Sequence, residues 1–375
     1  MPKKKLSHAK SIQRTKTIVD LFVSLLIVGT LGYLIKDSYD RSGTVGQTQY
    51  ADLSQVDEPT DPAASLDPDA IMFSTAQVST KDKFHGDLIL VNNNHEYFSS
   101  GDEDLVSIME MNDANGVDYF TAVDYTYTIM RPAYDAMAQM IKDFYNKYSN
   151  DTLIIYGSYR TKDFQTELYE NNDPDDEDAP LVAKPGFSEH ETGYAFDFSE
   201  TENYDYDGTG DFEWLNTNCY KYGFVVRYTK DKESITEIRN EPWHFRYVGK
   251  PHAYYMTKNN LCLEEYTDLI RNEHPYDGTH LEFSDEDGKN YEVYFYPSND
   301  AEEFTSVPVP SGRKYDISGN NIDGFVVTVY TDEKVDPGSE HPTEAPKTED
   351  ENSDSESDTD NNDDEQSGED YSEDE

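Results

Sequence analysis

The chain has 375 residues and a formal net charge of −48, from 78 acidic and 30 basic side chains. This length allows one core of ordinary domain size and a second, smaller one. So large an excess of negative charge argues against nucleic acid as a partner, because its phosphates would be repelled. The two cysteines, Cys219 and Cys262, are too few for a disulfide framework. They either pair outside the cell or remain as buried thiols.

The amino-terminal segment has the pattern of a membrane anchor. Residues 1–17 are rich in Lys and Arg, and the apolar run over 18–35 is broken only by Asp20. At 1.5 Å per residue, about 18 residues span roughly 27 Å, close to the ~30 Å hydrocarbon core of a bilayer. The basic residues keep that end in the cytoplasm, so the rest of the chain is expected outside the cell. A cleaved signal peptide is the alternative, but no A-x-A-like cleavage site follows.

Two segments have compositions that do not favour a folded core. Residues 36–70 are polar and acidic, contain proline and show no periodicity, which predicts a linker between the anchor and the next domain. Residues 335–375 place acidic side chains among Ser, Asn and Thr, with almost nothing apolar. Such a segment cannot bury enough surface to offset its ordering entropy, so a disordered acidic tail is expected.

Residues 71–270 show the mixed periodicity of a globular domain with helices and strands. Short apolar runs predict strands at 88–91, 153–156 and 224–228. Helical spacing predicts an amphipathic helix over 125–148, interrupted early by Pro132, and further helices over 162–169 and 212–222. Gly223 stands where the last of these helices should end.

Residues 275–334 are interpreted as a small β-rich module. Strands are predicted at 281–283, 291–296 and 325–330, and Asp287-Gly288 supplies a hairpin turn between the first two. No motif in this module indicates chemistry.

Two separated segments contain side chains suited to binding a metal ion. His190 and Asp197 are seven residues apart with Gly193 between them, so a turn at the glycine and a following strand would bring both to one cation. The second segment contains Glu241 and His244. Two imidazoles and one carboxylate make a three-ligand zinc site that leaves a fourth position open for water. Glu241 is well placed to act as general base beside that water.

These segments resemble the paired signature of the LAS zinc peptidases, S-x-H-x-x-G-x-A-x-D followed by E-P-W-H-x-R-Y. Their form is similar to that of D-Ala-D-Ala carboxypeptidases of the VanY type. Residues 157–161, 184–186 and 222–228 also fit the family in the same order, so the resemblance covers roughly 71–262. It implies an α+β fold in which helices flank a small antiparallel sheet, the LAS/Hedgehog-like arrangement.

The resemblance also implies roles for individual residues. His190, Asp197 and His244 match the ligands of one zinc ion per catalytic domain, and Glu241 matches the catalytic base. Arg160 matches the arginine that stabilises the developing oxyanion, for which a fixed guanidinium is well suited. A structural ion pair is the alternative for Arg160.

Three more residues, Tyr159, Gln165 and Ser188, match or adjoin positions that contact substrate in the family. Ser188 is alternatively a turn or capping residue, and Gln165 a solvated helix residue. The family's usual Ser-Gly-Tyr-Arg is Gly157-Ser158-Tyr159-Arg160 here, with the small residues exchanged. That exchange leaves the backbone beside the arginine in question.

The expected activity is zinc-dependent hydrolysis of the terminal D-Ala-D-Ala bond of peptidoglycan stem peptides, with release of D-Ala. The carboxypeptidases of the family have the E-P-W-H form, whereas the dipeptidases tend to carry a second aromatic residue where Pro242 stands. An LD- or DD-endopeptidase is one alternative. A wall-binding zinc protein without turnover is another, which the presence of Glu241 disfavours. We expect a single-pass membrane protein with an extracellular catalytic domain, and the oligomeric state is left open.

Overall fold

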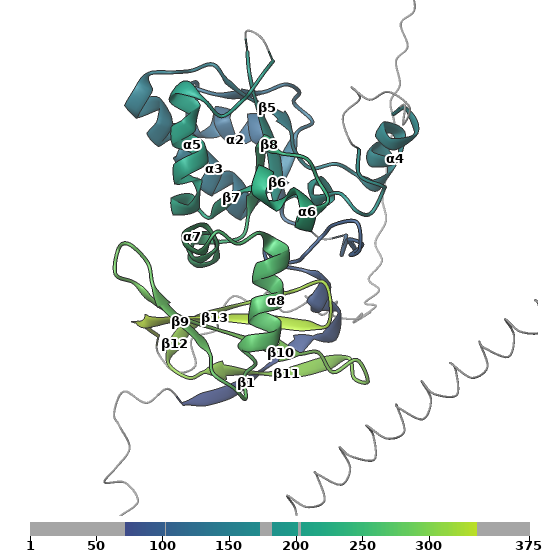
Figure 1. The fold of residues 1–375 in the computed structure, drawn as a ribbon, viewed down its shortest axis with the longest axis vertical. Coiled ribbons are helices and arrows are strands. Elements are labelled where there is room, and N and C mark those ends of the chain that lie inside the picture. The colour runs from purple at the N-terminus through teal and green to yellow at the C-terminus, as the bar shows by residue number, and fades with distance from the viewer. Residues whose placement is uncertain (1–71, 102, 173–181, 202–203, 336–375) are drawn as a thin grey trace, which may run out of the picture. The chain divides into compact units, whose positions relative to one another are not determined.

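The computed structural model describes residues 72–101, 103–172, 182–201 and 204–335 (Figure 1). The expected anchor, the linker and nearly all of the acidic tail lie outside these residues. In the part of the chain that is described, no helix combines the length and the apolar character needed to cross a membrane.

A five-stranded sheet forms the centre of the domain predicted over 71–270, in the order β3-β5-β6-β8-β7. Its strands are Thr121–Ala122 (β3), Leu153–Gly157 (β5), Ala195–Glu200 (β6), Phe224–Tyr228 (β7) and Glu241–Tyr247 (β8). The short β3 runs parallel to β5, and the other neighbours are antiparallel. Leu105–Ser107 (β2) and Thr128–Met130 (β4) form a separate antiparallel pair. The sheet is therefore mixed, although its site-bearing part is antiparallel as predicted.

The α-helices of the described chain are Ile108–Asn115 (α2), Arg131–Tyr148 (α3), Lys162–Glu170 (α4), Glu213–Asn218 (α5), Glu233–Thr236 (α6), Lys250–Asn259 (α7) and Leu263–Glu273 (α8). Short 3-10 turns are Thr80–Phe84 (η2), Glu189–Thr192 (η3), Gly210–Phe212 (η4), Cys219–Tyr222 (η5) and Lys230–Lys232 (η6). The helix predicted over 212–222 is thus a succession of η4, α5 and η5. It ends at Gly223, which has a left-handed φ of 94°.

The apolar face of α3 packs on the central sheet. Met137, Ile141 and Phe144 are fully buried in one core with Ile155 of β5 and Phe196 of β6. The helix begins later than its periodicity predicted. Pro132 lies in its first turn, where a missing N–H is not needed, so the proline starts the helix instead of interrupting it.

The β-rich module is built from both ends of the described chain. Leu281–Ser284 (β9), Asn290–Pro297 (β10), Arg313–Gly319 (β12) and Gly324–Lys334 (β13) form one sheet in the order β12-β13-β10-β9. Phe73–Ser79 (β1) pairs with Phe304–Pro310 (β11). The strands β9, β10 and β13 lie where they were predicted, whereas β11 and β12 were not predicted. The β1 strand falls within the range assigned to the catalytic domain, yet it pairs with the module.

The apolar run 88–91 is buried, but the strand predicted there is wrong. Side chains, and not a neighbouring strand, hydrogen-bond its carbonyl groups. Asn321 Nδ2 donates to the Leu90 carbonyl (2.8 Å), and Arg246 Nη2 donates to the Ile89 carbonyl (3.0 Å). A buried backbone needs partners, and here the partners come from the module and from β8.

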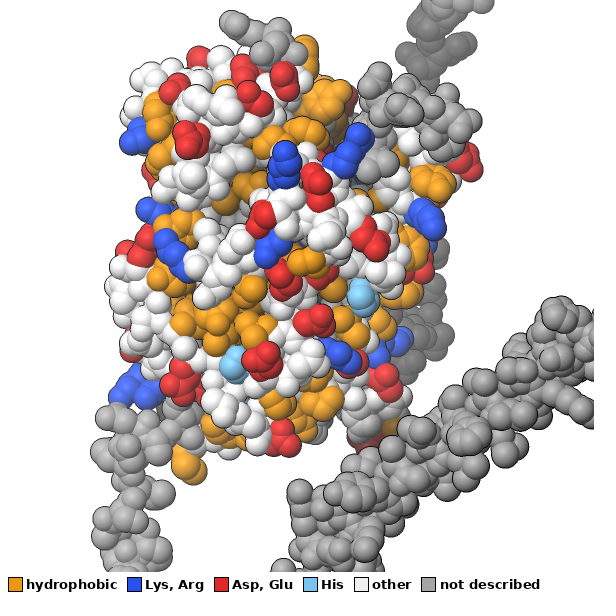
Figure 2. All heavy atoms as spheres, in the orientation of Figure 1, with side chains coloured by type: hydrophobic (Ala, Val, Ile, Leu, Met, Phe, Trp, Pro, Cys, Tyr) orange, Lys and Arg blue, Asp and Glu red, His pale blue; other side chains and the backbone are white. Residues whose placement is uncertain are grey.

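A second core joins the domain predicted over 71–270 to the module. Leu88 and Val225 share it with Tyr266 of α8 and with Val293 and Val326 of the module, and all five are buried. On the face shown in Figure 2, acidic and basic side chains are interspersed and do not form one acidic patch. Cys219 and Cys262 are separate buried thiols, the second of the two alternatives.

Candidate active site

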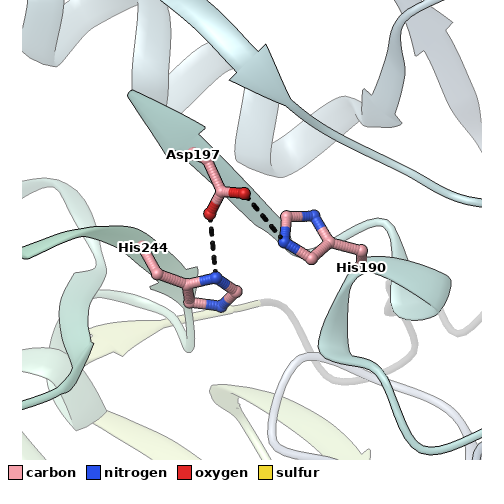
Figure 3. A group of neighbouring side chains, drawn as sticks. All are labelled: His190, Asp197 and His244. Carbon is pink, nitrogen blue, oxygen red and sulfur yellow. Dashed lines mark ion pairs between the residues drawn. The ribbon is translucent and has the colours of Figure 1, made fainter. Parts of the chain in front are cut away.

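The three predicted metal ligands lie together at the centre of the sheet (Figure 3). His190 comes from η3, Asp197 from β6 and His244 from β8, and one ligand atom of each lies within 4.8 Å of the others. Asp197 and His244 stand directly opposite each other in the β6–β8 register. Gly193, with a φ of 73°, ends η3 and turns the chain into β6. The structure thus contains the turn and strand that the glycine between the two ligands indicated.

Each imidazole points one nitrogen at the aspartate and bonds through the other. His190 Nε2 lies 3.2 Å from Asp197 Oδ2, and its Nδ1 is 2.9 Å from the Ser158 carbonyl. His244 Nδ1 lies 2.9 Å from Asp197 Oδ1, and its Nε2 is 3.4 Å from Glu189 Oε2. Outer partners of this kind set the tautomer and the ring orientation of metal-binding histidines. The two rings therefore face the aspartate with opposite nitrogens.

The electrostatics of this cluster favour a cation among the three side chains. Burial alone would lower the pKa of His244, but the carboxylates of Asp197 and Glu189 raise it to about 9. Burial alone would also raise the pKa of Asp197, but His190 and His244 hold it well below its ordinary value. Burial, together with the charge of Arg160, lowers the pKa of His190.

The donor set fits a zinc ion. Asp197 Oδ1 is buried and makes no hydrogen bond with any described residue, although His244 Nδ1 lies 2.9 Å away. With the proton of His244 on Nε2, two lone pairs would face each other there, an arrangement that a shared cation stabilises. Two imidazoles and one carboxylate are common ligands of catalytic zinc.

Glu241, the predicted base, lies at the start of β8 beside this cluster. Its Oε2 is 4.0 Å from His244 Nδ1, and the side chain is half-buried. Burial raises the pKa of Glu241 to about 7. A carboxyl group with such a pKa can accept and return a proton near neutral pH. Its catalytic role remains a prediction, which the geometry permits.

Arg160 also lies against the cluster. Its Nη2 lies 3.5 Å from Asp197 Oδ2 and its Nη1 lies 3.4 Å from Gln165 Oε1, while its backbone N–H donates to the His190 carbonyl. Gln165 is fully buried and donates to the Ala183 carbonyl (2.8 Å), so it is not the solvated residue of the alternative interpretation. In this position Gln165 orients the guanidinium of Arg160.

The other two predicted contact residues lie close by along the chain. Ser188 is buried just before η3, and its backbone N–H faces Glu191 Oε1 at 3.4 Å, as expected for a residue at a helical start. Tyr159 is half-buried, and its N–H donates to the Thr128 carbonyl (3.0 Å). Contact of either side chain with substrate remains a prediction.

The exchanged small residues have a physical reason in this structure. A Cβ on residue 157 would lie 2.4 Å from Asp197 Oδ2, far closer than any van der Waals contact, so a side chain there would force the carboxylate or the backbone of β5 to shift. The next residue, Ser158, then supplies the carbonyl that orients His190. The exchange therefore places glycine where the Asp197 carboxylate packs against the backbone of β5.

A buried charge network behind His244 was not predicted from the sequence. Glu189 is fully buried, and its Oε1 accepts from Arg227 Nε (2.8 Å) and from Arg246 Nη1 (3.0 Å). Burial alone would raise the pKa of Glu189, but the two guanidinium groups hold it well below its ordinary value. The available signal was an arginine inside each of two apolar strands, β7 and β8, and a glutamate directly before a predicted ligand.

Comparison with known proteins places the chain in a family. The VanY family, D-alanyl-D-alanine carboxypeptidase, matches residues 127–250. A D-alanyl-D-alanine carboxypeptidase of Enterococcus faecium is 30% identical over 265 residues, which are 70% of this chain and 80% of that protein. The chain belongs to the VanY family. It is a metallopeptidase, and the resemblance seen in its sequence is confirmed.

Two further relatives differ in their stated activity. VanXYC of Enterococcus gallinarum, a bifunctional D-Ala-D-Ala dipeptidase and carboxypeptidase, is 38% identical over 126 residues, 31% of this chain and 66% of that protein. The D,D-dipeptidase VanXYg, solved with a D-Ala-D-Ala phosphinate analogue, has a TM-score of 0.60 and 30% identity. The match covers 69% of this chain and 99% of VanXYg. Because the match extends over nearly all of VanXYg, the matched part of this VanY-family member has the fold of that structure.

Proposed function

We propose that this VanY-family chain is a zinc-dependent carboxypeptidase that releases the terminal D-Ala from peptidoglycan stem peptides ending in D-Ala-D-Ala. The observation that carries the proposal is the convergence of His190, Asp197 and His244 beside Glu241. The stated activity of the E. faecium relative, which matches over most of its length, supplies the substrate class.

His190, Asp197 and His244 would hold one zinc ion through the nitrogens and oxygens that face one another. Zinc supplies Lewis-acid activation of water and of the scissile carbonyl when it is bound. The remaining chemistry belongs to the side chains around it.

Glu241 and Arg160 carry that chemistry in the proposed mechanism. Glu241 accepts a proton from the attacking water while the water oxygen forms a bond to the carbonyl carbon of the peptide. It then gives the proton to the amino group of the leaving D-Ala as the peptide bond breaks. The guanidinium of Arg160 donates hydrogen bonds to the oxyanion that develops on the attacked carbonyl. Hydrogen-bond donors lower the activation barrier most where charge develops in the transition state.

The activity is tested by product analysis with the zinc-loaded protein. We expect free D-Ala and tetrapeptide from a pentapeptide stem ending in D-Ala-D-Ala. Glu241→Gln keeps all three ligands, so we expect it to bind zinc as the unmodified protein does while its kcat falls by roughly 10²–10⁴-fold. Absence of D-Ala from the pentapeptide would overturn the carboxypeptidase proposal.

A dipeptidase activity is the second candidate, because VanXYg is named as a D,D-dipeptidase and VanXYC as bifunctional. Free D-Ala-D-Ala in a parallel assay decides between the two candidates. Hydrolysis of the free dipeptide alone would assign the chain to the dipeptidases, and hydrolysis of both substrates would make it bifunctional. Release of cross-linked fragments from intact peptidoglycan would instead support the endopeptidase alternative.

The proposed location is the outer face of the cytoplasmic membrane. Its support is the apolar run 18–35 with basic residues before it. Protease added to intact cells should then digest the catalytic domain. Protection of the domain until the cells are lysed would contradict this location.

A further inference from the structure

The two carboxylate oxygens of Glu189 face different partners. Both arginines bind Oε1, from Arg227 Nε at 2.8 Å and from Arg246 Nη1 at 3.0 Å. The other oxygen, Oε2, lies 3.4 Å from His244 Nε2. All four of these side chains are buried. The arginines therefore determine which oxygen of Glu189 is presented to the histidine.

Further contacts prevent this arrangement from rotating. Arg227 also pairs with Glu264 of α8, through Nη2 at 2.7 Å and Nη1 at 2.9 Å. Arg246 Nη2 donates to the carbonyls of Asp87 and Ile89. Each guanidinium is thus held from two sides, and Glu189 is fixed between them.

We propose that Glu189 is a positioning residue, which holds the proton of His244 on Nε2 so that Nδ1 presents its lone pair to the metal. The inference rests on the zinc site of the proposed function and adds a residue to it. A carboxylate in contact with the outer nitrogen of a metal-binding histidine fixes its tautomer and increases its basicity. The competing interpretation is that Glu189 only neutralises two buried arginines.

Glu189→Gln separates the two interpretations. The amide oxygen of glutamine would turn to the guanidinium groups, which are donors only, so its NH₂ would face His244 Nε2. That nitrogen would then have to accept a hydrogen bond, which moves the proton of the ring to Nδ1 and removes the lone pair meant for the metal.

The measurement is zinc affinity of the full chain, by competition with a chelator of known affinity. We expect Glu189→Gln to bind zinc roughly 10–100-fold more weakly than the unmodified protein. Glu264→Gln is the matched control, since it removes a carboxylate from the same Arg227 without touching His244. Its affinity should stay within about twofold of the unmodified protein. Equal affinity losses in the two variants, or none in Glu189→Gln, would overturn the proposal.

A second measurement needs no substitution, in case Glu189→Gln does not fold. Nitrogen-15 NMR of the zinc-loaded, unmodified protein should show His244 with a protonated Nε2 and a metal-bound Nδ1. The reverse assignment would refute the role of Glu189. If the unmodified protein binds no zinc at all, the proposed function fails, whereas unchanged zinc binding in Glu189→Gln removes only this inference.

Discussion

At the scale of single residues, the site depends on short distances that leave little freedom. The Asp197 carboxylate is buried between two imidazoles and the guanidinium of Arg160, and it lies against the backbone at Gly157. A ligand held from so many sides is already oriented before any metal binds. Zinc affinity should therefore be sensitive to changes that never touch the metal.

Gly157→Ala tests this sensitivity. Its Cβ would lie 2.4 Å from Asp197 Oδ2, so the carboxylate or strand β5 must shift. We expect zinc affinity to fall about 10-fold or more, as for loss of an outer-shell partner. The control is Ser158→Ala, because the Ser158 hydroxyl has no hydrogen-bond partner among described residues and the carbonyl that binds His190 remains. Chelator competition on both variants gives the comparison, and an unchanged affinity for Gly157→Ala would contradict the argument.

At the scale of elements, a buried histidine joins two helices and a strand. His252 of α7 is hydrogen-bonded through Nδ1 to the Tyr266 hydroxyl of α8 (2.7 Å) and through Nε2 to the Thr328 hydroxyl of β13 (2.9 Å). Burial lowers the pKa of His252 to about 3, so it is neutral in the folded chain at pH 7. It therefore connects the elements without carrying charge.

The depressed pKa of His252 predicts a pH dependence of stability. In the unfolded chain the imidazole takes up a proton near pH 6.5, whereas in the folded chain it does so only near pH 3. The stability contribution is complete above pH 6.5 and is lost as the pH falls towards 3, by up to about 1.4 kcal/mol per pH unit. His252→Gln cannot take up this proton, so its free energy of unfolding should fall less steeply between pH 6.5 and 4. Denaturant titrations of both proteins at several pH values would check this, and identical slopes would refute it.

At the scale of the whole described chain, the module and the catalytic domain share a core. Leu281 of β9 is buried in the same cluster as Leu263 of α8 and Val225 of β7. Arg246 of β8 also holds the backbone of residues 87–89, and that segment is hydrogen-bonded to Ser318 of the module. Such continuity predicts that the two parts unfold together.

Leu281→Ala tests this coupling. Truncation of a buried leucine should lower the free energy of unfolding by about 2–5 kcal/mol. Tryptophan fluorescence, which comes from Trp214 packed against the catalytic core and from Trp243 of β8, should report the same lowered midpoint as circular dichroism of the whole chain. Ile235→Ala serves as control, because Ile235 is exposed. A fluorescence transition that Leu281→Ala leaves unchanged would show that the two parts are independent.

The sequence by itself determined the family and the predicted metal ligands, because these residues lie in short segments whose local geometry can be predicted. The glycine between His190 and Asp197 implies a turn before a strand. Glu241 and His244, three residues apart in the sequence, both lie in the first four residues of β8. The strands β5, β7, β9, β10 and β13 were also predicted, because apolar runs and turn residues mark them locally. The strands β1, β2, β3, β4, β8, β11 and β12 were not predicted; β11 contains Pro308 and Pro310, and β12 is largely polar.

Only the tertiary structure decided which residues hold His190, Asp197 and His244 in position. The contact of Glu189 with Arg246, the packing of Asp197 on Gly157 and the pairing of β1 with β11 join residues far apart in the chain. The burial of 88–91 without a ladder depends on side chains of β8 and the module. Local sequence patterns reflect secondary-structure propensity and hydrophobic periodicity. The tautomer of a histidine, or the need for a glycine, depends instead on which residues from distant parts of the chain pack against that position.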